Sequence, residues 1–216
     1  MWASAKTKMK ILIFGKQASG KGTQAKMIAE KYKLAHISTG DIFREIRIQD
    51  SALGKKVRAL IDSGQFVPDD VTTEIVMQKL KDKKGFILDG NPRNLAQVHA
   101  FEKVPVDLAL LIEISDQESI KRLSARRICS KCGEIYNLES RKPKKEDRCD
   151  KCGATILQRD DDKPAAIKKR LETYKKVTSP VVDFYKKKGI LREFDGAKPI
   201  ERIFAEICKI LDKIKH

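Results

Sequence analysis

Short apolar runs alternate with longer helical stretches along most of the chain. The runs predict buried strands at residues 10–14, 34–37, 85–89, 107–114 and 190–194. The stretches predict helices after Gly20, at residues 41–63, 69–83, 116–128 and 161–188, and from Pro199 onward. Strands that are separated by helices predict a parallel sheet, here of five strands, in an α/β fold.

Two segments do not fit the sheet pattern. Residues 41–67 are helical without an intervening strand, and Pro68 with Asp69 suits the start of a new helix. Residues 129–158 are too long for a simple connection, so we expect a small subdomain there. The expected organisation is a core of residues 9–37, 68–128 and 159–216, insertions at 38–67 and 129–158, and an N-terminal extension of residues 1–8.

A glycine-rich loop follows the first expected strand. Residues 15–21 read GKQASGK, which fits the G-x-x-x-x-G-K pattern of a P-loop between a strand and a helix. Glycines let backbone N–H groups approach phosphate oxygens, and Lys21 adds a full charge. The alternative is a chance glycine-rich turn. Gly22 stands where such loops usually carry a Mg²⁺-binding Ser or Thr, so magnesium would depend on phosphates, water and a carboxylate.

Charge and composition limit the classes of function. The formal net charge is +16, but 33 of the 46 basic residues are lysines scattered among acidic neighbours. This favours a solubilising surface over a nucleic-acid site, although affinity for an anionic substrate remains open. Apolar runs are far too short to span a membrane, and residues 1–8 lack the apolar region of a secretion signal. We therefore expect a cytoplasmic protein.

Motifs along the chain resemble those of the adenylate kinases, in the same order, from about Met9 to the end. They are GKGTQ at 20–24, STGDIFR at 38–44, GFILDGNPR at 85–93 followed by Gln97, RLSARR at 122–127, RDDD at 159–162, RLETY at 170–174 and DGAKP at 195–199. The resemblance implies a P-loop kinase core, a helical AMP-binding insertion at 38–67 and a lid at 129–158. It also implies reversible, Mg²⁺-dependent phosphoryl transfer from ATP to AMP, giving two ADP, by a monomer that serves adenine nucleotide balance.

The resemblance also implies roles for individual residues. For phosphoryl transfer these are Lys21, Asp89, Arg93, Arg126, Arg159 and Arg170. For ATP they are Gly15, Ser19, Gly20, Lys21, Gly22, Thr23, Arg122, Arg126 and Lys198, and for AMP they are Thr39, Arg44, Val67, Gly90, Arg93, Gln97, Arg159 and Arg170. Arginine suits this chemistry because its planar guanidinium binds phosphate oxygens in pairs and stays protonated.

Several of these assignments have simpler alternatives. An arginine can form a surface ion pair, Asp89 can cap the next helix instead of orienting water on Mg²⁺, and the Asp161–Asp162 pair can cap a helix instead of latching the lid. Thr39 and Gln97 favour AMP over pyrimidine nucleotides because Gln97 can both donate to and accept from adenine, but both could merely cap turns. The chain departs from the family at Gln17, Ala18 and Asn91, where Pro, Gly and Phe are common. Ala18 would be strained if its φ is positive.

Four cysteines form two close pairs in the expected lid. Cys129 and Cys132 are separated from Cys149 and Cys152 by 16 residues, a spacing that suits a structural zinc site. A redox pair is the alternative, although disulfides are disfavoured in the cytoplasm. The segment has seven basic and five acidic residues and one aromatic residue, Tyr136, which does not suit a nucleic-acid reader. A kinase for another monophosphate and a nucleotide-dependent nucleic-acid-binding module remain the alternative functions.

Overall fold

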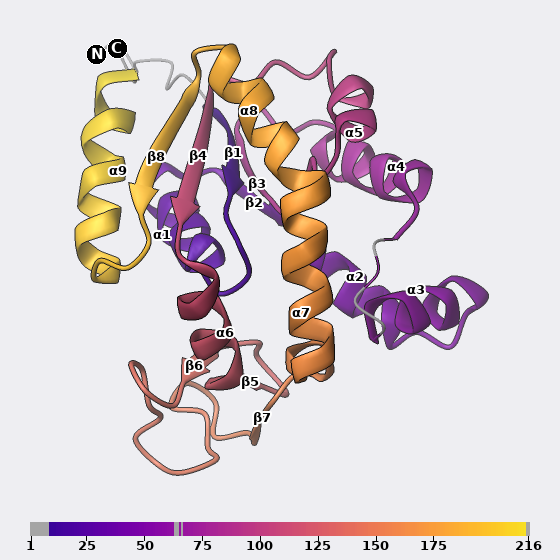
Figure 1. Ribbon diagram of the computed structural model, residues 1–216, viewed down its shortest axis with the longest axis vertical. Coiled ribbons are helices and arrows are strands. Elements are labelled where there is room, and N and C mark those ends of the chain that lie inside the picture. Colours follow the sequence, from indigo (N-terminus) through magenta and orange to yellow (C-terminus); the bar gives the residue numbers. More distant parts are fainter. Residues whose placement is uncertain (1–8, 63–64, 66, 215–216) are drawn as a thin grey trace, which may run out of the picture.

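Five parallel strands form one sheet in the order β2-β3-β1-β4-β8 in the computed structural model, which describes residues 9–62, 65 and 67–214 (Figure 1). The strands are β1 (Lys10–Phe14), β2 (Ala35–Ser38), β3 (Phe86–Asp89), β4 (Leu108–Glu113) and β8 (Leu191–Asp195). Each lies within one residue of its predicted bounds. The predicted α/β fold with a parallel five-stranded sheet is therefore confirmed.

Both faces of the sheet are buried, because apolar side chains alternate between them. In β1, Ile11 and Ile13 join the core on one face, while Leu12 and Phe14 join the core on the other. The carboxyl ends of three strands lie level, since Ser38 of β2 pairs with Asp89 of β3, and Asp89 pairs with Ile13 of β1. Open α/β sheets bind ligands at such an edge.

Helices cover both faces of the sheet (Figure 1). The helices α1 (Lys21–Tyr32) and α9 (Ile200–Ile214) pack on one face, and α4 (Asp69–Leu80), α5 (Leu95–Ala100) and α8 (Ser179–Lys187) pack on the other. The sequence did not predict α5. Its start is capped by Asn94, whose Oδ1 accepts from the Gln97 backbone N–H at 2.8 Å. Within the part of the chain that is described, no helix is both long and apolar enough to cross a membrane.

The segment after β2 is two helices, so the prediction of one helix over 41–63 was wrong. They are α2 (Thr39–Arg47) and α3 (Ala52–Asp62), and Ser63 lies outside the described residues. The Ser51 side chain accepts from the Gly54 backbone N–H at 3.0 Å, which stabilises a new helix start. The sequence Asp-Ser at 50–51 carried this signal.

The predicted helix at 116–128 is also shorter, because the chain enters a second sheet. After α6 (Asp116–Ser124), strand β5 (Arg126–Cys129) pairs antiparallel with β6 (Ile135–Asn137) and β7 (Ile156–Leu157). The Leu138 N–H donates to the Ala125 carbonyl at 2.9 Å, and Asn137 Nδ2 donates to the Arg122 carbonyl at 3.1 Å. Residues 137–138 therefore bind the end of α6 and direct the chain into the sheet.

The predicted helix at 161–188 begins later and changes its winding in the middle. A short 3₁₀ turn covers Asp160–Asp162, α7 covers Pro164–Thr173, and a π-helical turn at Tyr174–Thr178 joins α7 to α8. Pro164 stands in the first turn of α7, where its missing N–H costs no hydrogen bond. Figure 1 shows α7 and α8 as one long rod that runs from the β5–β7 sheet to the main sheet.

Candidate active site

The loop between β1 and α1 forms a narrow backbone cradle. A Cβ placed on Gly15 would lie 2.5 Å from Ser19 Oγ and would collide with the Ile112 carbonyl, so only glycine fits there. Lys21 is the first residue of α1, and its Nζ donates to the Lys16 carbonyl across the loop at 3.2 Å. The first turn of α1 has no acidic residue, so its positive potential is available to an anion. Gly20, Gly22 and Thr23 belong to this loop and first turn.

Ala18 meets the condition under which strain is expected at this position. Its φ is +58°, in the left-handed region that glycine adopts more easily. The Ala18 side chain packs against a small cluster of Leu123, Ile167 and Leu171, which joins α6 to α7. This apolar contact offsets part of the strain, and it links the P-loop to the helix that carries Arg170.

Asp89 lies beside the start of α1. Its side chain is buried at the end of β3, and a Cβ on Gly22 would come within 3.3 Å of Asp89 Oδ2. Glycine at position 22 therefore leaves room for the carboxylate next to the P-loop. Burial lowers the pKa of Lys21 to about 8, against the opposing effect of Asp89. Asp89 does not cap α5, because Asn94 does.

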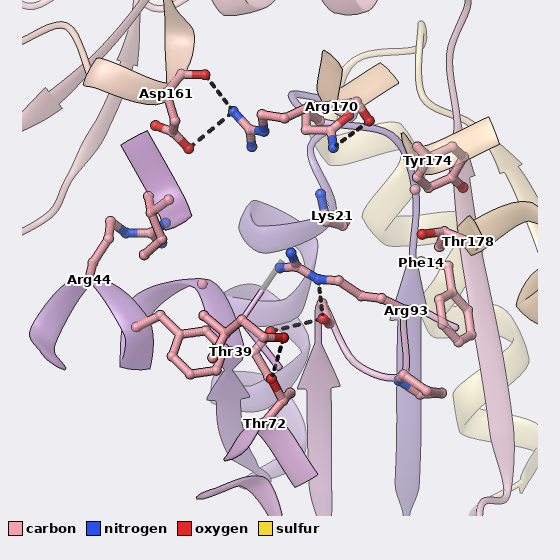
Figure 2. Close-up of a pocket in the computed structure, with 18 of the residues that line it drawn as sticks. Phe14, Lys21, Thr39, Arg44, Thr72, Arg93, Asp161, Arg170, Tyr174 and Thr178 are labelled. Carbon is pink, nitrogen blue, oxygen red and sulfur yellow. Dashed lines mark hydrogen bonds and ion pairs between the residues drawn. The ribbon is translucent and has the colours of Figure 1, made fainter. Parts of the chain in front are cut away.

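One cleft collects residues from the P-loop, α2, the loop after β3, and α7. Of the residues named from the sequence, Gly15, Lys21, Thr39, Arg44, Val67, Gly90, Arg93, Gln97, Arg159 and Arg170 line it. Figure 2 shows the charged ends of Lys21 and Arg93 together in the middle of the cleft, with Arg44 on one side and Tyr174 and Thr178 on the other. Four elements far apart in sequence thus direct cations toward one space.

The wall of the cleft formed by α2 and the loop after β3 is strongly hydrogen-bonded. Thr39 Oγ1 donates to the carbonyls of Gly90 at 2.9 Å and Asp89 at 3.2 Å. Arg93 Nε donates to the same Gly90 carbonyl at 2.7 Å, and Arg44 pairs with Asp41. These contacts fix the side chains of Thr39 and Arg93 against the loop that follows β3.

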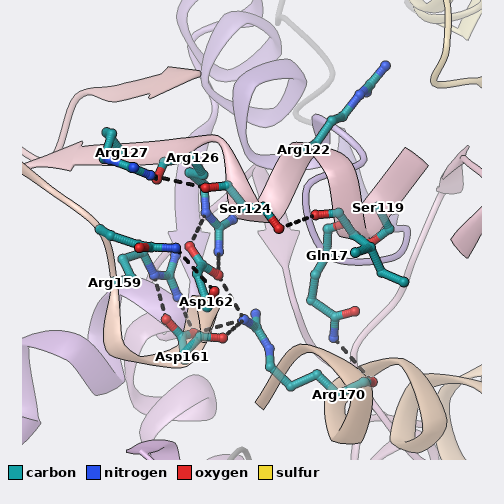
Figure 3. A network of polar contacts seen from close by, with 12 residues as sticks. Gln17, Ser119, Arg122, Ser124, Arg126, Arg127, Arg159, Asp161, Asp162 and Arg170 are labelled. Carbon is teal, nitrogen blue, oxygen red and sulfur yellow. Dashed lines mark hydrogen bonds and ion pairs between the residues drawn. The ribbon is translucent and has the colours of Figure 1, made fainter. Parts of the chain in front are cut away.

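Two buried carboxylates hold three arginines beside the β5–β7 sheet (Figure 3). Arg126 binds Asp162 through Nε at 2.7 Å and Nη2 at 2.5 Å, and Arg159 binds Asp161 through Nε at 2.8 Å and Nη2 at 2.5 Å. Arg170 Nη1 lies 3.1 Å from Asp161 Oδ2 and 3.3 Å from Asp162 Oδ1. Asp161 and Asp162 therefore do more than cap α7, whose N-cap is Lys163.

Asp161 and Arg170 of this cluster stay charged at neutral pH. Burial alone would raise the pKa of Asp161, but Arg170 and Arg159 hold it well below its usual range. Burial lowers the pKa of Arg170 to about 10, although Asp161 opposes the shift. Three guanidinium groups share two carboxylates, so cations outnumber anions in the cluster.

Arg122 and Lys198 lie apart from the cleft. Arg122 donates to Glu118 at 2.6 Å and to the Gly196 carbonyl at 2.9 Å, and Figure 3 shows it pointing away from the other arginines. Lys198 pairs with Glu206 at 2.9 Å. Arg122 binds the 195–199 turn and Lys198 belongs to it, so the two residues share one surface outside the lining of the cleft.

The four paired cysteines come together in the β5–β7 subdomain. Their sulfur atoms all lie within 4.8 Å of one another, with Cys129 and Cys152 at 3.4 Å and Cys132 and Cys149 at 3.6 Å. Four sulfurs around one zinc at about 2.3 Å would be about 3.8 Å apart, so the set fits such an ion. The Tyr136 hydroxyl donates to Cys149, which lowers the pKa of that thiol to about 6 and favours the thiolate that metals bind.

The sequence did not identify every residue that lines the cleft. Phe14, Phe43, Thr72, Pro92 and Thr178 line the cleft, but nothing in their type points to nucleotide chemistry. Tyr174 also lines it and was visible only as part of the RLETY motif. Burial, with a smaller effect of Glu113, raises the pKa of Tyr174 to about 12, so its hydroxyl stays protonated.

Comparisons with known proteins agree with this geometry. A family model described as adenylate kinase matches residues 13–190. An adenylate kinase of Thermodesulfovibrio yellowstonii is 45% identical over 95% of this chain and 100% of its own length. Adenylate kinases of Treponema denticola and Archaeoglobus fulgidus are 47% and 43% identical, over 91% and 96% of this chain and 96% and 100% of their own lengths.

Proposed function

The chain belongs to the adenylate kinase family and is an ATP:AMP phosphotransferase, and we propose that its cleft holds the two nucleotides end to end between fixed cations. The observation that carries this arrangement is the convergence of Lys21, Arg93 and Arg170 on one cleft. The reaction is reversible and converts ATP and AMP into two ADP. This agrees with the function expected from the sequence motifs.

We assign the donor phosphates to the P-loop and the acceptor phosphate to the opposite wall. The backbone N–H groups of the loop, the N-terminus of α1 and Lys21 bind the ATP phosphates. Arg44 and Arg93 bind the AMP phosphate. Arg126 and Arg159 stabilise the transferring group, and Arg170 bridges the two nucleotides. Arg122 and Lys198 flank the adenine of ATP, which their common position beside the 195–199 turn supports.

The chemistry needs positioning more than proton transfer. The AMP phosphate has a second pKa of ~6, so its oxygen is already an anion at neutral pH and needs no general base. That oxygen forms a bond to the terminal phosphorus of ATP while the bond to the leaving ADP oxygen breaks. Charge builds on the transferring group, and preorganised guanidinium groups in a cleft with little water stabilise it.

Asp89 is the residue that we assign to magnesium. The ion accompanies ATP and neutralises phosphate charge during transfer. The space that Gly22 leaves for the buried Asp89 carboxylate beside the P-loop supports this assignment. Asp89 would take the part of the Ser or Thr that other P-loops have after the lysine. Asp89 would act by orienting water in the magnesium shell.

We propose zinc as the ion of the cysteine cluster, with a structural role. Cys129, Cys132, Cys149 and Cys152 would use all four tetrahedral positions, which leaves none for substrate. Only Tyr136 and Ile156 join Cys129 and Cys149 in the buried apolar core of the described lid. Such a small core needs an additional cross-link to stay folded, and the metal would act as this staple. A rigid lid would then exclude water from the transferring group.

Other parts of the interpretation stay predictions from sequence. They are the division into a core (9–37, 68–128 and 159–216), an AMP-binding insertion (38–67) and a lid (129–158), together with a monomeric state, a cytoplasmic location and the absence of a nucleic-acid or membrane partner. Residues 1–8, the predicted extension, lie outside the described residues.

A panel of acceptors tests the proposed function. Zinc-loaded protein with MgATP should phosphorylate AMP in preference to UMP, CMP and GMP. Lys21→Met should lower the rate by at least about a thousandfold, because a fixed cation at the phosphates is lost. Lys83→Met, the same change at an exposed site, should have no effect. Release of inorganic phosphate alone, or transfer to another acceptor, would contradict the proposal.

A further inference from the structure

A compact polar network lies behind the acceptor wall of the cleft. Gln97 lines the cleft and is almost fully buried, and Asn91, one of the departures from the family pattern, is completely buried beside it. Asp69 and Asn94 complete the network, because Asn94 Nδ2 donates to both oxygens of the Asp69 carboxylate at 2.8 Å. The network decides which atoms of Gln97 remain for a ligand.

Two contacts fix the orientation of the Gln97 side-chain amide. The Arg93 backbone N–H donates to Gln97 Oε1 at 2.7 Å, and Gln97 Nε2 donates to Asp69 Oδ1 at 2.6 Å. A backbone N–H can only donate and an ionised carboxylate can only accept. Exchanging the amide oxygen and nitrogen would break both contacts, so the orientation is unambiguous.

Asn91 then uses the remaining acceptor capacity of Gln97. Asn91 Nδ2 donates to Gln97 Oε1 at 2.9 Å, so that oxygen receives two hydrogen bonds, one for each lone pair. One N–H of Nε2 is the hydrogen-bonding capacity that Gln97 has left. The nearby Gly90 carbonyl also receives two donors, Thr39 Oγ1 and Arg93 Nε.

We propose that Asn91 is a positioning residue. By occupying Gln97 Oε1, it leaves Gln97 only the Nε2 N–H donor with which to bind the base of the acceptor nucleotide. The proposal rests on the AMP-binding role of Gln97 given above. An N–H donor recognises the N1 lone pair of adenine, whereas the 6-amino group, itself a donor, gains nothing from an oxygen that is already saturated. A residue without a donor at position 91, such as Phe, would leave Oε1 free to accept from that amino group. Asn91 therefore makes the acceptor site tolerant of purine monophosphates that lack the 6-amino group.

The test compares AMP with purine riboside 5′-monophosphate, which has N1 but no 6-amino group. With saturating MgATP, wild-type protein should show kcat/KM values for the two acceptors within about fivefold of each other. Asn91→Leu keeps the number and branching of the side-chain heavy atoms but removes the donor. The Asn91→Leu variant should raise the ratio of kcat/KM for AMP to that for the analogue by about three- to tenfold. The change should come from KM, and its size is that expected for one neutral hydrogen bond.

A double-variant cycle separates positioning from general disruption. In Gln97→Met protein the additional Asn91→Leu change should not alter the ratio, because the oxygen through which it acts is absent. A wild-type preference for AMP above fivefold would overturn the proposal, and this measurement needs no variant to fold. A shift below threefold in Asn91→Leu, or an equal shift in the Gln97→Met background, would also overturn it. Failure to phosphorylate AMP at all would instead refute the proposed function.

Discussion

Lys21 combines a fixed position with a charge that can change near neutral pH. Because burial lowers its pKa to about 8, part of the free protein has a neutral Lys21 at pH 8. Bound phosphates favour the protonated form, so ATP binding should take up about half a proton at pH 8 and almost none at pH 6.5. Calorimetric titration with MgATP in buffers of different ionisation enthalpy measures this uptake. It should disappear in Lys21→Met, and uptake that persists there would assign it to another group.

Asp161 gives the arginine cluster a characteristic acid sensitivity. Its pKa is lower in the folded than in the unfolded protein, so the stability it contributes is present above its unfolded pKa of 3.8 and is lost as pH falls toward the folded value. Asp161→Asn should lower the free energy of unfolding by about 2–3 kcal/mol at pH 7, with a smaller difference at pH 3. Urea unfolding at both pH values tests this. The exposed Glu172→Gln change should matter little, and a difference for Asp161→Asn that is independent of pH would contradict the account.

At the scale of residues, the sequence predicted the types of group in the cleft better than their partners. Lys21, Arg93 and Arg170 follow from motifs, because glycine-rich loops and arginine clusters have recognisable spacing. The contact of Asn91 with Gln97 could not be predicted, since it depends on how the loop after β3 turns back beside α5. Asp161 and Asp162 were visible as a pair, but only their burial among three arginines distinguishes them from a helix cap.

At the scale of elements, we expect the β5–β7 subdomain, the proposed lid, to depend on a metal ion at its cysteine cluster. Verified removal of the metal under reducing conditions should lower the thermal midpoint and increase hydrogen exchange in residues 126–158 while the strands of the main sheet stay protected, because the lid has little core of its own. Atomic absorption and exchange mass spectrometry measure the two effects. Cys208→Ser, a buried cysteine outside the cluster, should retain the metal. An unchanged midpoint in metal-free protein would exclude the staple role.

The strands were predicted closely, and the helix ends were not. The three inner strands, β3, β1 and β4, are nearly continuous apolar runs, so their pattern alone defines them. The edge strands β2 and β8 are partly polar and were found as short segments between helices. Helix ends depend on tertiary contacts, as the binding of the α6 carbonyls by residues 137–138 shows. Short elements such as α5 and the 3₁₀ turn at Asp160–Asp162 have too few residues for a periodic signal, and their start depends on a cap such as Asn94.

At the scale of the whole molecule, the positive charge is spread widely. If it serves solubility and attraction of phosphate substrates, duplex DNA at 150 mM salt should not inhibit transfer to AMP, since binding that depends on scattered lysines is weakened strongly by salt. Rate measurements with increasing DNA test this prediction. Inhibition with a steep salt dependence would support a nucleic-acid site instead.

The π-helical turn at Tyr174–Thr178 sets the direction in which the side chains of α7 point relative to those of α8. Such a turn is equivalent to one residue added to an α-helix, and each helical residue advances the direction of the side chains by about 100°. Arg170 lies before the turn and faces the cleft, while Val181 and Tyr185 lie after it and pack on the sheet. In an uninterrupted α-helix with the same packing of Val181 and Tyr185, Arg170 would rotate away from the phosphates. One extra residue in the winding therefore lets a single rod meet two surfaces that an ideal helix could not face at once.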